Sequence, residues 1–234
     1  MKLRWPWSRN ECHPSIIENN AQFKHFNQSA PIETYDFVSL DTELTGLNFR
    51  KDAIVSIGAV KIRGLQIIAG NNFFTYVHPK RSLPKVSTLI HRITPDQLEN
   101  APDLKSVLPE LIQFIGNALI VGHFINLDMG FINRASKRLL HGRLVNPCID
   151  SMKMAKAYQD LQHASYFGGG DVATGYSLNA LSKKYGLPRF QQHDALGDAF
   201  QTACLFMFLV NKLQSLGCKT LKDLRSTTTI SPYW

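Results

Sequence analysis

The chain has 234 residues, of which 44% are hydrophobic, so it is long enough to bury one sizeable core. There are 26 lysine and arginine residues against 18 aspartate and glutamate residues, which gives a net charge of +8. This charge is typical of a protein with a polyanionic partner such as nucleic acid, and the simpler alternative is a solvated basic surface. No segment has the apolar length of a membrane span, and the four cysteines form no Cys-x-x-Cys pair. The composition therefore argues against a membrane protein and a disulfide scaffold, and predicts a cytoplasmic protein with reduced thiols.

The chain divides into three predicted regions. Residues 1–33 mix Trp, Pro and Asn without sustained periodicity, and we expect an extension that packs on the core or on a partner. Residues 34–214 carry the periodic strands and helices of one domain. Residues 215–234 are expected to form a C-terminal helix and tail.

The most informative segment is a hydrophobic run that ends in two carboxylates. Residues 37–40 are mostly apolar, Asp41 and Glu43 follow, and Thr45-Gly46-Leu47 has the composition of a turn. Side chains two residues apart on a strand point to the same side, so the two carboxylates can hold a divalent cation together. We expect them at the exposed end of a buried strand, where open α/β sheets place their sites.

The following segments predict a three-stranded meander and then alternating helices and strands. Their apolar periodicity changes from two to 3.6 residues after the third strand. The expected strands lie around residues 53–63, 66–77, 118–121 and 144–149, and the expected helices around residues 104–115, 129–140 and 194–210. This order predicts an α/β fold with a mixed sheet.

Two later segments add acidic residues to the pair. Residues 121–128 end in Asp128, and His193 is followed five residues later by Asp198 at the start of a predicted helix. Hard divalent cations prefer carboxylate oxygens, and a histidine near neutrality can take a proton from water. Three acidic segments with one histidine are typical of a metal-dependent hydrolase.

These motifs, in this order and spacing, resemble those of the DEDD-type 3′–5′ exonucleases of the histidine subclass. That family includes the proofreading (epsilon) subunit of bacterial DNA polymerase III. The resemblance covers roughly residues 35–212. It implies a ribonuclease H-like fold, with a mixed five-stranded sheet and helices on both faces, and makes residues 34–214 the expected exonuclease domain.

The resemblance also implies the roles of the motif residues. Two divalent cations, Mg²⁺ or Mn²⁺, would be held by Asp41, Glu43, Asp128 and Asp198, with Asp41 bridging them. His193 would act as the general base.

Substrate contacts are predicted from the turn after the first strand and from the family's His-x-Ile-Thr segment. This chain departs from the family in having Phe124 where many members have Asn and Leu127 in place of Phe, so we expect altered contacts to the terminal nucleotide. Leu44 replaces a frequent Thr, and we expect a small effect because the backbone can still turn through Gly46. The predicted contact residues are Thr42, Leu44, Thr45, Gly46, His91 and Leu127.

The resulting hypothesis is a metal-dependent 3′–5′ exonuclease that releases nucleoside 5′-monophosphates from single-stranded or frayed DNA ends, with a DNA polymerase as a candidate partner in replication or repair. An exoribonuclease of the same family remains open, because the sequence does not show how a 2′-hydroxyl would be contacted. A non-catalytic nucleic-acid or polymerase-binding module on this fold is the third alternative.

Overall fold

A computed structural model describes residues 11–80, 83–165 and 175–228 of the chain. The outer parts of the predicted extension and tail, residues 1–10 and 229–234, lie outside the described residues. The strands are β1 (Phe37–Leu44), β2 (Ile54–Arg63), β3 (Gln66–Tyr76), β4 (Leu119–Gly122) and β5 (Cys148–Asp150). The helices are α1 (Pro14–Ala21), η1 (Ile32–Thr34, a 3-10 turn), α2 (Lys85–His91), α3 (Pro95–Glu99), α4 (Leu104–Ile115), α5 (Asn126–Leu139), α6 (Ser151–Ser165), α7 (Leu178–Lys184), α8 (Ala195–Ser215) and α9 (Leu221–Thr228).

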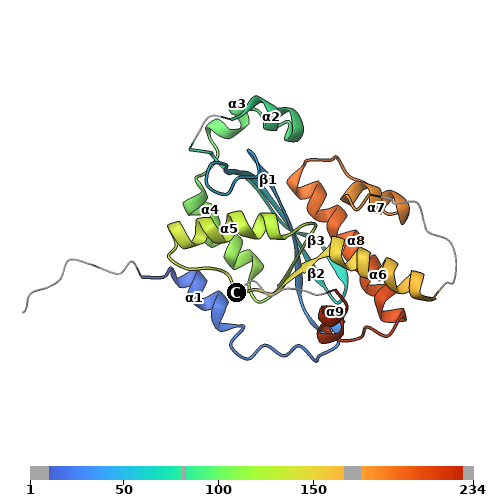
Figure 1. The fold of residues 1–234 in the computed structure, drawn as a ribbon. Helices are drawn as coiled ribbons and strands as arrows, with labels where there is room; N and C mark the ends of the chain where they lie inside the picture. The colour runs from blue at the N-terminus through green and yellow to red at the C-terminus, as the bar shows by residue number, and fades with distance from the viewer. Residues whose placement is uncertain (1–10, 81–82, 166–174, 229–234) are drawn as a thin grey trace, which may run out of the picture.

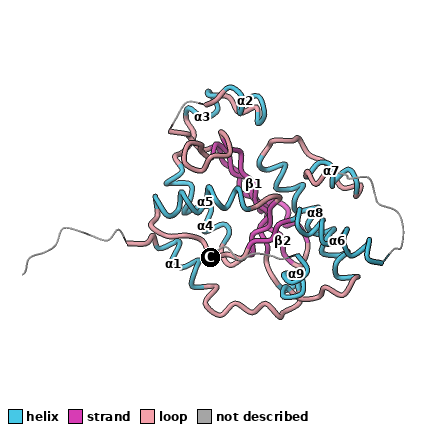
Figure 2. Tube along the Cα trace, in the orientation of Figure 1, coloured by secondary structure: helices cyan, strands magenta, loops and turns pink. Residues whose placement is uncertain are grey.

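The five strands form one mixed sheet in the order β3-β2-β1-β4-β5 (Figure 1). β1, β2 and β3 form the predicted antiparallel meander, and β4 and β5 extend the sheet in parallel with β1. Figure 2 shows the strands between two groups of helices. The predicted fold class, a ribonuclease H-like α/β sheet covered on both faces, is confirmed.

The two faces of β1 bury different cores because its side chains alternate. Val38 and Leu40 pack with α1, α4 and α5 on one face. Phe37 points to the other face, where its ring lies 4.8 Å from that of Phe206 in α8. Ser39 shares this second face and donates a hydrogen bond to the Ala199 carbonyl of α8. The alternation therefore sets which helix approaches each residue of β1.

The fifth strand begins later than the sequence predicts, at Cys148 instead of residue 144. Pro147 has no N–H to donate to a ladder, and the Asn146 side chain donates to the carbonyls of Gly116 and Ala118. Leu144 is buried in the core without being part of a strand. The apolar character of Leu144 therefore reflects its place in the core, and the strand begins only after Pro147.

The segments around the sheet share its core. Ile16 of α1 packs in the core on the face of the sheet that α4 and α5 cover. Ile32 of η1 and Leu224 of α9 pack in the core on the face that α8 covers. Pro31 and Thr220 form an isolated antiparallel bridge, which joins the segment before η1 to the segment between α8 and α9. The division into an extension, a domain and a tail remains a prediction.

Two expectations from composition concern the whole molecule. All four cysteines are free, and two of them, Cys148 and Cys218, are buried. Among the described helices, none combines the length and apolarity needed to cross a bilayer.

Candidate active site

The carboxyl end of β1 brings the predicted metal ligands together. Asp41 and Glu43 share the face of β1 that is covered by α8, whose first turn carries Asp198. Carboxylate oxygens of Glu43 and Asp198 and a ring nitrogen of His193 lie within 4.8 Å of one another. Residues of the first and third motifs, at least 150 positions apart in the chain, therefore lie together.

Asp128 reaches this site from the opposite face of the sheet. The parallel pairing of β1 with β4 ends at Ser39, so the edge of β1 beyond that residue is free of strand partners on this side. The Asp128 carboxylate occupies this edge, where Oδ1 accepts hydrogen bonds from the Thr42 amide at 3.0 Å and the Thr42 hydroxyl at 2.6 Å. Thr42, predicted to touch substrate, is buried and holds Asp128 in place.

His193 lies in the loop before α8, in a left-handed backbone conformation with φ of 59°. Its amide donates to Asp198 Oδ2 at 3.0 Å, and Asp194 caps the helix by accepting from the Gly197 amide at 3.0 Å. The His193 side chain is exposed. The helix fixes Asp198, and the loop presents the imidazole beside it to solvent.

A close approach between α8 and β2 sets the position of this helix. Gly58 pairs with Asp41 across the sheet, and a Cβ atom at Gly58 would lie 2.3 Å from the Ala195 carbonyl carbon. Only a glycine permits this approach, because the conflicting atoms are backbone. The first turn of α8, with Asp198, therefore lies directly over the strand pair that carries Asp41.

The carboxylates disfavour one another's charge. Burial, together with the charges of Asp128, Asp198, Glu43 and Asp194, raises the pKa of Asp41 well above its usual range. Burial raises the pKa of Glu43 to about 8 and that of Asp128 to about 7, and it also raises the pKa of Asp198. Such a set of oxygen donors with unbalanced negative charge fits a divalent cation.

The predicted substrate residues near the end of β1 make most of their contacts within the protein. The Thr45 hydroxyl accepts from the Ala53 amide at 2.9 Å and donates to Asp52 at 3.3 Å. A Cβ at Gly46 would lie 2.5 Å from Asp52, so this glycine lets the loop close. Leu44 and Leu127 are half-buried against the core. Their contact with substrate remains a prediction.

His91 lies near His193, although the two residues are distant in the chain. It is 5% exposed; Nδ1 accepts from the Ile93 amide at 3.0 Å, and Nε2 has no hydrogen-bond partner among the described residues. Burial and the neighbouring charge of His193 lower the pKa of His91. The structure thus places the His-x-Ile-Thr segment beside the third motif.

Sequence reasoning missed one acidic residue of this region, Asp150 at the end of β5. Its Oδ1 accepts from the amides of Phe124 and Met152, and its charge contributes to the raised pKa of Asp128. Phe124 has a left-handed φ of 58° and is 47% exposed. The signal was present in the sequence, since an aspartate directly after a buried strand repeats the pattern of Asp41.

The fold and the site define a metal-dependent phosphodiester hydrolase of the ribonuclease H-like class. A sequence model of the RNase T exonuclease family matches residues 38–206, and the chain belongs to this family of DEDD exonucleases. It is therefore a nuclease, as the sequence predicts.

Relatives and solved structures agree with this assignment. The chain is 32% identical over 216 residues to the PolC-type DNA polymerase III of Thermotoga petrophila, covering 90% of this chain and 15% of the relative. It is 34% identical over 203 residues to that of Thermotoga maritima, covering 84% of this chain and 14% of the relative. The chain thus spans about one seventh of the length of these relatives.

Two solved structures are similar in fold. Exonuclease X in complex with 5′ overhanging duplex DNA is 26% identical with a TM-score of 0.59, covering 82% of this chain and 99% of the other. Escherichia coli exonuclease I in complex with a dT13 oligonucleotide is 16% identical with a TM-score of 0.62, covering 78% of this chain and 42% of the other.

Replacing Gly58 with alanine is expected to lower metal-dependent hydrolysis at least tenfold and to destabilise the fold by about 1–3 kcal/mol, because the new methyl group displaces the first turn of α8. Steady-state kinetics and thermal denaturation measure the two effects. Gly175→Ala is the matched control, since Gly175 has open space around its Cβ position and should behave as wild type. Wild-type kinetics for Gly58→Ala would show that this approach does not position Asp198.

The raised carboxylate pKa values predict that the metal-free protein loses stability as the pH rises from about 5 to 8. In this window the folded state binds more protons than the unfolded state, so the free energy of unfolding falls with pH. Thermal denaturation in chelator measures this slope, and Mn²⁺ should oppose the loss at pH 8. Asp41→Asn removes one of the repelling charges and is expected to be more stable than wild type in chelator at pH 8. An equal or lower melting temperature would contradict the assigned repulsion.

Proposed function

We propose that this chain is a 3′–5′ exonuclease that removes nucleoside 5′-monophosphates from single-stranded or frayed DNA ends. The observation that carries the proposal is the convergence of Asp41, Glu43, Asp128, Asp198 and His193 at the carboxyl end of β1 in a chain of the exonuclease family. The alternative of a non-catalytic module lacks support, because every carboxylate of the family pattern is present and lies at this end of the strand.

The four carboxylates would hold two divalent cations. The cations, Mg²⁺ or Mn²⁺, would supply charge stabilisation for both the attacking and the leaving oxygen of the phosphodiester. Asp41 would hold both cations, a role supported by its position among the other three carboxylates, whose charges all act on it. Asp128 is oriented by the Thr42 amide and hydroxyl, which leaves it little freedom to follow the substrate.

His193 is proposed to take the proton from the attacking water. Its imidazole is exposed at the rim of the site, and its backbone amide is tied to Asp198. A base in a loop can turn toward the water without moving the carboxylates.

DNA is favoured over RNA by the relatives. The chain is similar to segments of PolC-type DNA polymerases, and the structural neighbours include an exonuclease bound to a dT13 oligonucleotide and one bound to 5′ overhanging duplex DNA. A duplex with a 5′ overhang presents a recessed 3′ end. The same relatives support a role beside a DNA polymerase, in proofreading or repair.

Replacing Asp41 with alanine is expected to lower metal-dependent hydrolysis by roughly 10³-fold or more, because the bridging ligand is lost. The measurement is the shortening of matched 5′-labelled single-stranded DNA and RNA oligonucleotides with Mg²⁺, with Mn²⁺ and with chelator. Wild type should give a ladder that shortens from the 3′ end, at least tenfold faster on DNA than on RNA. Faster hydrolysis of RNA would identify an exoribonuclease, and wild-type turnover by a folded Asp41→Ala variant would refute the assignment of this ligand.

Replacing His193 with alanine is expected to slow hydrolysis by roughly 10²- to 10⁴-fold, because proton removal from water loses its base. Mn²⁺ affinity, measured by titration calorimetry, should stay within a few-fold of wild type. His25→Ala, a substitution at an exposed histidine of the N-terminal segment, is the control. Unchanged turnover for His193→Ala would assign the base elsewhere, and loss of Mn²⁺ binding would make His193 a ligand.

A further inference from the structure

The exposed face of α5 carries a cluster of cations that the active site does not use. Arg134, Lys137 and Arg138 are exposed on this helix, and Arg143 is exposed in the segment that follows it. Residues three and four positions apart share a helix face, so the three helical cations form one row. We call the four residues Arg134, Lys137, Arg138 and Arg143 the basic ridge.

The ridge lies between two grooves. One, of about 650 Å³, is lined by all four ridge cations together with Met129, Gly130 and other uncharged residues, and none of the described residues that line it carries a carboxylate. The other, of about 410 Å³, shares Arg134 and Arg138 with the first. Its lining adds the cations Arg50, Lys80 and Lys105 and the carboxylate of Asp52.

The carboxylates near the second groove have other partners. Asp52 accepts hydrogen bonds from the Asn48 amide at 2.8 Å and the Thr45 hydroxyl at 3.3 Å. Asp103 caps α4 by accepting from Ser106, and it lies near Lys80 and Lys105. Within the part of the chain that the structure describes, no ion pair is formed by a ridge cation. The positive charge of the ridge is therefore available to a ligand.

Helix stabilisation explains only part of this arrangement. Lys137 and Arg138 lie in the last turn of α5, where cations interact favourably with the helix dipole. Arg134 lies in the middle of the helix, and Arg143 and Arg50 come from other segments. A surface built by residues from separate segments points to an external polyanion.

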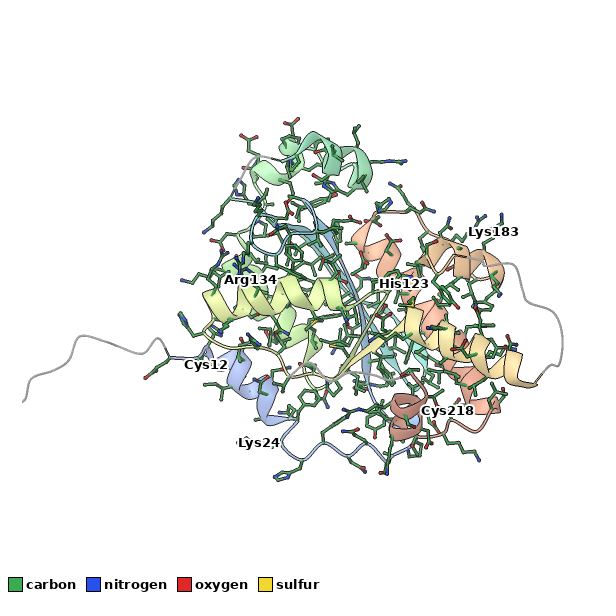
Figure 3. The ribbon with its side chains drawn as sticks, viewed as in Figure 1. Cys12, Lys24, His123, Arg134, Lys183 and Cys218 are labelled. Carbon is green, nitrogen blue, oxygen red and sulfur yellow. The ribbon has the colours of Figure 1, made fainter. Side chains whose placement is uncertain are left out.

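The ridge and the active site share the helix α5, which carries Asp128 on its buried face and three of the ridge cations on its exposed face. Asp128 lies in the first turn of this helix, and Arg138 lies ten residues later, about 15 Å away along the axis at 1.5 Å per residue. At about 3.4 Å per stacked nucleotide, this distance corresponds to about four nucleotides of a strand. In Figure 3, the first turn of α5 lies between the labelled residues His123 and Arg134.

We propose that the basic ridge binds the phosphates of the substrate nucleic acid upstream of the 3′ end that lies at the carboxylates. This inference rests on the proposed function. The ridge offsets the repulsion that the acidic site exerts on a polyanion, and it holds the strand while the end is trimmed. The arginines suit this role because each guanidinium can donate two hydrogen bonds to one phosphate.

The test compares two variants that lose the same charge. Arg134→Gln/Arg138→Gln/Arg143→Gln removes three ridge cations, and Lys24→Gln/Lys183→Gln/Lys219→Gln removes three exposed lysines from other elements, two of which are labelled in Figure 3. Fluorescence anisotropy with a 5′-labelled dT20 and a dT3 oligonucleotide, in chelator to prevent cleavage, measures affinity as a function of salt. Thermal denaturation confirms folding.

The ridge variant should bind dT20 roughly 10- to 100-fold more weakly than wild type at 0.1 M salt, and the slope of log affinity against log salt should fall by about 2, since each lost contact to a single strand removes about 0.7. The loss should be smaller for dT3, which is too short to reach the whole ridge. Arg134→Lys/Arg138→Lys/Arg143→Lys should retain most of the affinity.

Equal affinities and salt slopes for the ridge variant and the lysine control would overturn the ridge proposal, and the proposed function would stand if wild type still trims 3′ ends. Weaker binding by the ridge variant in a protein that cleaves neither DNA nor RNA would support the ridge and overturn the proposed function. A loss that is equal for dT3 and dT20 would contradict an upstream position of the ridge.

Discussion

Four carboxylates gathered at the carboxyl end of β1 repel one another, and the fold must hold them together against that repulsion. Asp41 and Glu43 are carried by the central strand of the sheet, where they pair with β2. Asp128 is fixed by two hydrogen bonds from Thr42, and Asp198 by the first turn of α8. Burial and this mutual repulsion raise the pKa values of these groups, and cation binding would relieve the repulsion.

The scaffold meets this demand by using both faces of one strand. The alternation of β1 directs Asp41 and Glu43 toward α8, and the end of β4 leaves an open edge that α5 fills with Asp128. Gly58 lets α8 approach the sheet closely enough to complete the site. A side chain at Gly58 would therefore alter the geometry of the carboxylates without touching cation or substrate, because rigid elements transmit displacements of the backbone.

The charge distribution separates two tasks. Negative charge lies at the carboxyl end of β1, whereas part of the excess positive charge lies on the exposed face of α5 and along the two grooves beside it. An acidic site alone would repel the substrate that it hydrolyses. A neighbouring basic surface attracts the polyanion and directs its end toward the carboxylates, which makes the position of the cations more informative than their number.

The sequence by itself determined the meander, the helices α4, α5 and α8, and the residues of the three acidic motifs. Those features depend on local periodicity and on residue type, as the strand before Asp41 and the helix after His193 show. Only the tertiary structure decided the bonds from Thr42 to Asp128, the proximity of His91 to His193 and the support that Asp150 gives to Phe124. It also decided which of the 26 basic residues lie together on the ridge. The physical reason is that these contacts join residues far apart in the chain, whose distances follow from the packing of helices on the sheet and leave no periodic signal in the sequence.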